Sequence, residues 1–222
     1  MRVKTLSEEE YRALIDGGRV VEQDANGSMV TFLADGTVLK IFPQKPFLSS
    51  DTLRPYATRF VRNAAKLHAL GIWTVTILAQ FKINHLGAMA VHYEPIPGRT
   101  LRSLGASTDD SPALVSDFAT FIASLHDRGI YFRAIHLANV IVNHDHKMGL
   151  IDMDDLWTKK RPLNFNERLR NIGKTYRYPE DVEFLRSPGE SFFIDAYLAA
   201  TAASDTESWR APLQAQQDAA HR

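Results

Sequence analysis

The chain has 222 residues and no cysteine, which excludes disulfide bonds and cysteine-ligated metal sites. Its 26 basic and 26 acidic residues give a formal net charge of zero, so we expect no nucleic-acid partner, because that class usually carries a basic excess. No apolar run reaches the ~20 residues of a membrane helix, and the N-terminus lacks a signal peptide's apolar core, so we expect a soluble cytoplasmic protein.

The first half of the chain alternates short β-like runs with turn signals. The expected strands are residues 19–22, 28–33, 37–42, 74–78 and 89–93. Turn signals at 24–27 and 34–36 join the first three into a three-stranded meander. One helix is expected before residue 74, beginning near the capping residues Ser49, Ser50 and Asp51, with Pro55 in its first turn and Gly71 at its end.

The second half is mainly helical. Ser111 as N-cap and Pro112 as the first helical residue open a helix that closes at Gly129. Residues 139–142 and 149–151 are expected to form a hairpin around the polar turn 143–147, and helices should follow over 165–175 and 192–203.

This order of elements predicts an α+β fold with two lobes. A small β-rich N-lobe with one helix would span residues 1–94, and a Pro/Gly hinge would span 95–98. A mainly helical C-lobe would span 99–210, and residues 211–222 would be a frayed tail. Small ligands commonly bind in a cleft between lobes.

The most informative pattern is the stretch 125–142 followed by 149–154, which resembles the catalytic core of the protein-kinase-like superfamily. Phe132-Arg133-Ala134 stands where the family has a His-Arg/Gly-Asp triplet, and Asn139 stands where an asparagine opens a short strand. Asp152 stands where a hairpin presents a metal-binding aspartate. The resemblance implies a bilobal kinase-like fold that binds ATP and Mg²⁺ through the oxygen donors of Asn139 and Asp152. The alternative for each of them is a loop-capping role.

Residues upstream extend the resemblance. Lys40 ends an alternating strand, as the phosphate-binding lysine of kinases does, and Gly27 lies in the turn that corresponds to the glycine-rich loop. Glu94 and Ile96 lie in a segment that resembles the hinge whose backbone receives adenine. The alternatives are a strand lysine that faces solvent, and ordinary turns.

The chain departs from the family pattern at two positions. Ala134 replaces the aspartate that orients or deprotonates the acceptor hydroxyl, a role typically worth ~10²–10⁴ in rate. Asn63 stands near the position of the glutamate that pairs with the lysine. His136 and Asp154, with Arg133 of the triplet, are the candidate catalytic groups, although His136 could instead brace the loop and Asp154 could cap the next segment.

Segments 33–42, 131–140, 149–152 and 168–172 resemble the bacterial lipopolysaccharide-kinase-like group, which includes the toluene-tolerance proteins. This resemblance implies an ATP-dependent kinase acting on a sugar or lipopolysaccharide-type hydroxyl acceptor. The alternatives are a pseudokinase that binds nucleotide or a protein partner as a regulatory module, and a helical regulator without a nucleotide site. The basic stretch 159–177 could meet an anionic acceptor or lipid headgroups, in peripheral contact with the inner membrane, or could be a solvated face.

Overall fold

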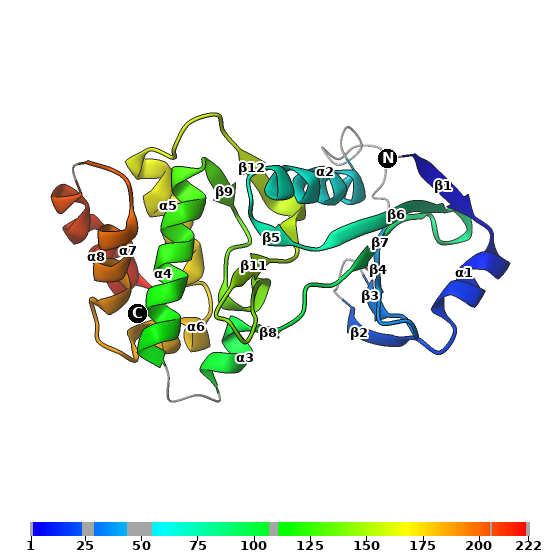
Figure 1. The fold of residues 1–222 in the computed structure, drawn as a ribbon, viewed down its shortest axis with the longest axis horizontal. Coiled ribbons are helices and arrows are strands. Elements are labelled where there is room, and N and C mark those ends of the chain that lie inside the picture. The colour runs from blue at the N-terminus through cyan, green and yellow to red at the C-terminus, as the bar shows by residue number, and fades with distance from the viewer. Residues whose placement is uncertain (1, 24–28, 44–54, 107–110, 205, 221–222) are drawn as a thin grey trace. The chain divides into compact units, whose positions relative to one another are not determined.

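The computed structural model describes residues 2–23, 29–43, 55–106, 111–204 and 206–220. It divides into two compact units, Met1–Ile96 (unit 1) and Pro97–Arg222 (unit 2), which are described separately (Figure 1). Both helices and strands are present, so the α+β class is confirmed. The predicted phosphate-loop residue Gly27 and the capping residues Ser49, Ser50 and Asp51 lie outside the described residues.

A six-stranded sheet forms the body of unit 1, with strand order β1-β6-β7-β4-β3-β2. Its strands are β1 (Val3–Leu6), β2 (Arg19–Gln23), β3 (Met29–Phe32), β4 (Val38–Pro43), β6 (Thr76–Ile83) and β7 (Ala88–Glu94). The antiparallel order β2-β3-β4 confirms the predicted meander. Between β3 and β4, Asp35 accepts hydrogen bonds from the backbone and hydroxyl of Thr37, and Gly36 has φ 83°.

Unit 1 contains α1 (Glu8–Ile15) as well as α2 (Tyr56–Ala69), so the prediction of one helix in this region is wrong. A capping box starts α1: Ser7 Oγ accepts from the Glu10 backbone N–H, and the Glu10 carboxylate accepts from the Ser7 N–H. Tyr11 of α1 is buried in an apolar cluster with Leu39 and Ile83, and this packing holds the helix on the sheet.

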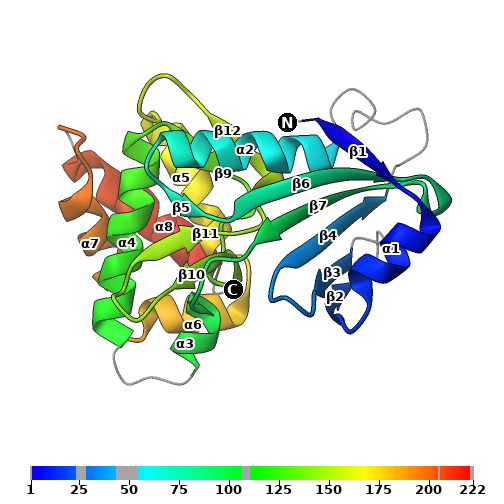
Figure 2. The ribbon, with the colours of Figure 1, turned by 45° about the vertical axis from the view of Figure 1, so that its right-hand side comes forward.

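The expected helix is α2, which runs along β6 and β7 (Figure 2). Pro55 is its N-cap residue and not a first-turn residue. Its buried face includes Phe60, Asn63 and Leu67, and Gly71, with φ 71°, follows its last turn as predicted. Trp73–Thr74 is a short strand, β5, after the helix.

The long helix α4 (Ser111–Asp127) forms the centre of unit 2. The predicted apolar stripe of Leu114, Phe118, Ile122 and Leu125 is buried. It packs beside α7 (Phe192–Ala200), where the rings of Phe118 and Phe193 stack with centroids 5.8 Å apart (Figure 1). Ser111 is the first helical residue and not the N-cap, and α7 ends three residues earlier than expected.

The remaining strands of unit 2 pair in short antiparallel ladders. The predicted hairpin is confirmed as β10 (Val140–Val142) and β11 (Met148–Leu150), and β8 (Arg99–Thr100) pairs with β10. The strands β9 (Ile130–Phe132) and β12 (Leu156–Thr158) form a separate ribbon. The other helices are α3 (Leu101–Gly105), α5 (Phe165–Thr175), α6 (Pro179–Arg186) and α8 (Arg210–Ala219). Helix α5 has the predicted bounds.

The expectation of a frayed tail is wrong for residues 211–219, which belong to helix α8 (Arg210–Ala219). Leu213 and Gln217 of this helix are buried, and the helix packs on α5 and α7. The Tyr176 hydroxyl donates to Gln217 Oε1 at 3.1 Å, so both this hydrogen bond and the burial of Leu213 hold α8 in place. Among the described helices, none combines the length and apolarity needed to cross a bilayer.

Candidate functional site

The loop 133–139 follows β9 and is held by backbone hydrogen bonds at its start. The Arg133 N–H donates to the Asp155 carbonyl at 3.0 Å, and the Ile135 N–H donates to the Phe132 carbonyl at 3.2 Å. Further along, the Leu137 N–H donates to Asp181 Oδ2 at 3.1 Å. The loop is therefore fixed both to the ribbon β9–β12 and to helix α6.

Asp181 is the buried anchor of this loop. Its carboxylate is fully buried and accepts two hydrogen bonds from the Arg102 guanidinium, at 2.7 and 2.9 Å. No pattern in the sequence associates Asp181 or Arg102 with the loop, because both lie far from it in the chain. The only local signal was an acidic residue in the first turn of a helix that begins with Pro179.

Asn139 ends the loop, and its side chain is turned back onto it. Its Nδ2 donates to the Ala134 carbonyl at 2.9 Å and to His136 Nε2 at 3.1 Å. A carbonyl oxygen can only accept, so these contacts fix the orientation of the amide. Both amide hydrogens are used, and Oδ1 is the atom of Asn139 that could bind a cation.

His136 is held in one tautomer by the same contact. Because Nε2 accepts from Asn139, a neutral His136 carries its proton on Nδ1. Nδ1 is buried and has no hydrogen-bond partner within the described part of the chain. Burial and then the nearby Arg102 cation lower the pKa of His136, although the Asp152 carboxylate acts in the opposite direction.

The geometry therefore favours a bracing role for His136. Its ring lies edge-on to Tyr178, with centroids 5.1 Å apart. One nitrogen lone pair is engaged by Asn139, and the other nitrogen carries the proton. The prediction that His136 accepts a proton from a substrate stays a prediction, and it would require the bond to Asn139 to break.

Asp152 follows the hairpin strand β11 in a left-handed backbone conformation, with φ 57° and ψ 40°. Such a conformation is uncommon outside glycine, and it often occurs where a side chain must be aimed at a site. The Ile151 N–H donates to the Asn139 carbonyl at 3.1 Å, so the hairpin brings the neighbourhoods of the two predicted metal ligands together.

Asp152 is followed by a short 3₁₀ turn, Met153–Asp155, that contains Asp154. Met153 is fully buried, whereas Asp154 and Asp155 are half-buried. Asp155 lies 3.5 Å from the Nε of Arg133, whose guanidinium carbon lies 5.6 Å from the centre of the Trp157 ring. Arg133 is thus exposed beside an exposed aromatic ring and an acidic turn.

In unit 1, Lys40 lies in the middle of the buried strand β4, and its residue is 9% exposed. Its Nζ lies 5.4 Å from the ring centre of Phe42 and 5.8 Å from that of Phe60 on α2. The side chain therefore lies on the face of the sheet that α2 covers. The alternative interpretation, a strand lysine that faces solvent, is wrong. Asn63, on α2, is also buried.

The other predicted nucleotide-binding residues lie at the end of unit 1. Glu94 is the exposed last residue of β7, and Ile96 is buried. Lys40, Glu94 and Ile96 thus belong to unit 1, and Arg133, His136, Asn139, Asp152 and Asp154 belong to unit 2. The structure brings the predicted residues of unit 2 together in one loop and hairpin.

The donor set at Asn139 and Asp152 fits a Mg²⁺ ion that is completed by a ligand. The described residues contain no cluster of three or more His, Cys, Asp or Glu side chains suited to a metal. Mg²⁺ usually takes only one or two protein carboxylates and fills its shell with water and phosphate oxygens. Asp152 and the Oδ1 of Asn139 are donors of that kind.

Comparison of the chain with models of known protein families gives no match, and comparison with curated proteins gives none either.

Proposed function

We propose that the chain is a kinase-like protein that binds Mg-ATP, with units 1 and 2 as the two lobes of a protein-kinase-like fold. The observation that carries the proposal is the local geometry of unit 2. The side-chain amide of Asn139 is hydrogen-bonded to the Ala134 carbonyl and to His136. The Asn139 carbonyl accepts from the Ile151 N–H, and the next residue, Asp152, has a left-handed backbone conformation. Non-glycine residues held in this conformation cluster at functional sites, which supports the proposal.

In this proposal, Asn139 and Asp152 would hold a magnesium ion through their side-chain oxygens, and such an ion would supply positive charge against the phosphate groups. Lys40 binds the phosphates, since its ammonium group is a compact cation carried on a rigid central strand. The backbone of the segment containing Glu94 and Ile96 receives the adenine, and Gly27 lies in the turn over the phosphates.

Phosphoryl transfer to a sugar or lipid-linked hydroxyl is the enzymatic form of the proposal. Ala134 offers no side chain to orient the acceptor, and both nitrogens of His136 are engaged or protonated. Asp154 would then accept the acceptor's proton, and the exposed Arg133 would contact the acceptor or its phosphate. The lost aspartate favours a second candidate, a pseudokinase that binds nucleotide and regulates a partner without transferring phosphate.

Thermal unfolding with and without Mg-ATP tests the site. A ligand that binds only the folded state at 100 times its Kd stabilises it by about 2.7 kcal/mol. We expect this stabilisation in the wild type and its loss in Asp152→Asn, since asparagine tolerates the left-handed backbone but lacks the charge. The matched control is Asp145→Asn, the same change at a side chain 70% exposed in the turn of the same hairpin.

No stabilisation of the wild type, or equal stabilisation of Asp152→Asn and the control, would refute nucleotide binding at this site. ATP turnover with sugar and lipid-linked acceptors then separates the two candidates. Turnover that falls in Asp154→Asn supports the kinase. Nucleotide binding without turnover supports the pseudokinase, provided that the Ala134→Asp variant also shows no turnover.

A further inference from the structure

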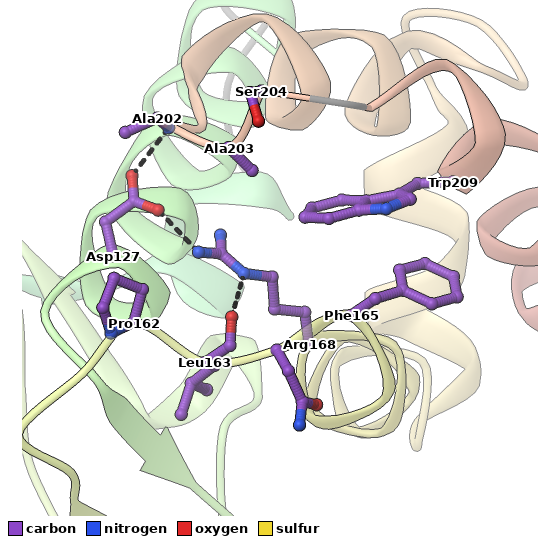
Figure 3. A pocket seen from close by; sticks show the side chains of 10 residues that line it. Asp127, Pro162, Leu163, Phe165, Arg168, Ala202, Ala203, Ser204 and Trp209 are labelled. Atoms are coloured by element: carbon purple, nitrogen blue, oxygen red, sulfur yellow. Dashed lines mark hydrogen bonds and ion pairs between the residues drawn. The ribbon is translucent and has the colours of Figure 1, made fainter.

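Unit 2 contains a pocket of about 360 Å³ that shares no residue with the loop 133–139 or the hairpin (Figure 3). It lies among the C-terminal end of α4, the start of α5 and the segment that follows α7. Its floor is the ion pair of Asp127 and Arg168, and its walls include Phe165, Trp209 and Ala203. The volume is at the lower end of the range for ligand sites, which limits an occupant to a small ring system.

The floor of the pocket presents one hydrogen-bond donor and one acceptor. Arg168 is 2% exposed, and its Nε donates to the Leu163 carbonyl at 2.8 Å. Its Nη2 carries two hydrogens and donates one, to Asp127 Oδ1 at 2.7 Å. Asp127 Oδ2 accepts from the Ala202 N–H at 3.0 Å and has capacity for a second donor. Within the described part of the chain, the second Nη2 hydrogen has no acceptor.

The charges on this floor balance. Burial raises the pKa of Asp127, but the Ala202 N–H and the Arg168 cation outweigh it and lower the pKa overall. Asp127 is therefore ionised at neutral pH beside a permanently charged Arg168. A charged ligand would be attracted by one of these groups and repelled by the other, whereas a neutral ligand with adjacent donor and acceptor atoms satisfies both.

The walls of the pocket suit a flat ring. Trp209 and Phe165 pack with ring centroids 5.2 Å apart, and the guanidinium carbon of Arg168 lies 5.5 Å from the Trp209 ring centre. Figure 3 shows Trp209, Ala203 and Arg168 around the same hollow. Stacking on an indole face is favourable for any planar ring, and the small side chain of Ala203 leaves the space open.

We propose that this pocket binds a small, neutral, planar ring with a lactam edge, which stacks on Trp209, donates its N–H to Asp127 and accepts from Arg168. Ligand binding in this pocket does not depend on nucleotide binding by the loop and hairpin. It gives unit 2 a site for a small heterocyclic ligand of its own.

The test uses 2-quinolone as the probe and N-methyl-2-quinolone as its matched control, which lacks the donor. The indole N–H resonances of the protein's three tryptophans are followed by NMR, and Trp209 is assigned with Trp209→Phe. We expect 2-quinolone to shift the Trp209 resonance in a saturable way and to bind about tenfold more tightly than the control, because it alone donates to a carboxylate.

Ala203→Phe fills the pocket and should abolish the shift, whereas Ala215→Phe, at an exposed position on α8, should leave it unchanged. Asp127→Asn should reduce the tenfold preference for 2-quinolone, because a neutral amide oxygen accepts more weakly than a carboxylate. The Ala203 variant tests the site independently if that change unfolds the unit. The proposal is overturned by no shift, by equal binding of the two probes to the wild type, or by a shift that persists in Ala203→Phe.

Discussion

Mild acid should destabilise unit 2 through one buried histidine, His126. This residue is fully buried near the end of α4, and its Nε2 lies 3.1 Å from Asn171 Oδ1. Asn171 donates its Nδ2 to the Phe132 carbonyl at 2.7 Å, so its Oδ1 must accept from His126. The His126 Nδ1 then accepts from the Tyr197 hydroxyl at 2.9 Å. The network satisfies a neutral imidazole and has no place for a second proton.

The magnitude follows from the pKa of this group. Burial is the main cause that lowers the pKa of His126 from 6.5 to about 3, against the opposing effect of the Asn171 hydrogen bond. Between these values the unfolded chain binds a proton that the folded chain does not, so stability falls as pH falls. Each pH unit below 6.5 costs about 1.4 kcal/mol, and at pH 5.0 the loss is about 2 kcal/mol.

Urea unfolding at pH 7.5, 6.5, 5.5 and 5.0 measures the effect. In a Trp73→Phe background, the remaining indoles, Trp157 and Trp209, both report on unit 2. His126→Gln is the matched variant because its amide does not titrate. It should be less stable than the parent at pH 7.5, and the difference should shrink by about 2 kcal/mol by pH 5.0. A difference that stays constant with pH would refute the reasoning.

Three further substitutions test the packing of unit 2 by urea unfolding. Gly129→Ala should cost about 1–3 kcal/mol, because φ is 73° and the new Cβ would lie 2.3 Å from the Arg161 carbonyl; an unchanged midpoint would contradict this. Asp181→Ala should cost about 3 kcal/mol, because the buried Leu137 N–H loses its acceptor and the half-buried Arg102 keeps only the exposed Glu180 as an ion-pair partner; a loss under ~1 kcal/mol would count against the role of Asp181 as the loop anchor. Leu213→Ala should lower the free energy of unfolding by about 2–4 kcal/mol, because Leu213 is buried where α8 packs. A loss near zero would instead support a frayed C-terminal tail.

The sequence predicts those elements whose signals are local. Helix α5 has its predicted bounds because a capping box of Asn164 and Glu167 starts it and apolar residues repeat at helical spacing. Helix α1 carries the same signal in Ser7 and Glu10, and attention to that spacing would have predicted it. Helix α8 has a single large apolar side chain, Leu213, and it is held by tertiary contacts with α5 and α7 that composition does not show.

In the candidate site, too, the sequence predicts the contacts between residues that are close in the chain and misses those between distant residues. Asn139 and Asp152 are near each other because a short hairpin joins them, so a motif read along the chain was sufficient to associate them. Asp181 contacts the loop at Leu137, 44 positions earlier, through a helix that no local signal ties to it. The pocket at Trp209 joins three separate segments, and no linear pattern predicts such a convergence.

Ala134 shows why binding and transfer should be judged separately in this chain. The hydrogen bond that orients Asn139 ends on the Ala134 backbone carbonyl, and every amino acid has that carbonyl. The Leu137 N–H to Asp181 bond and the packing of His136 on Tyr178 likewise use no atom of the side chain at position 134. Alanine at this position therefore leaves the support of Asn139 intact and lacks only a side chain that could touch an acceptor. Under the proposed function, Mg-ATP binding by the loop would therefore not require a proton acceptor at position 134, and Ala134→Asp is the change that would add such a group without disturbing these contacts.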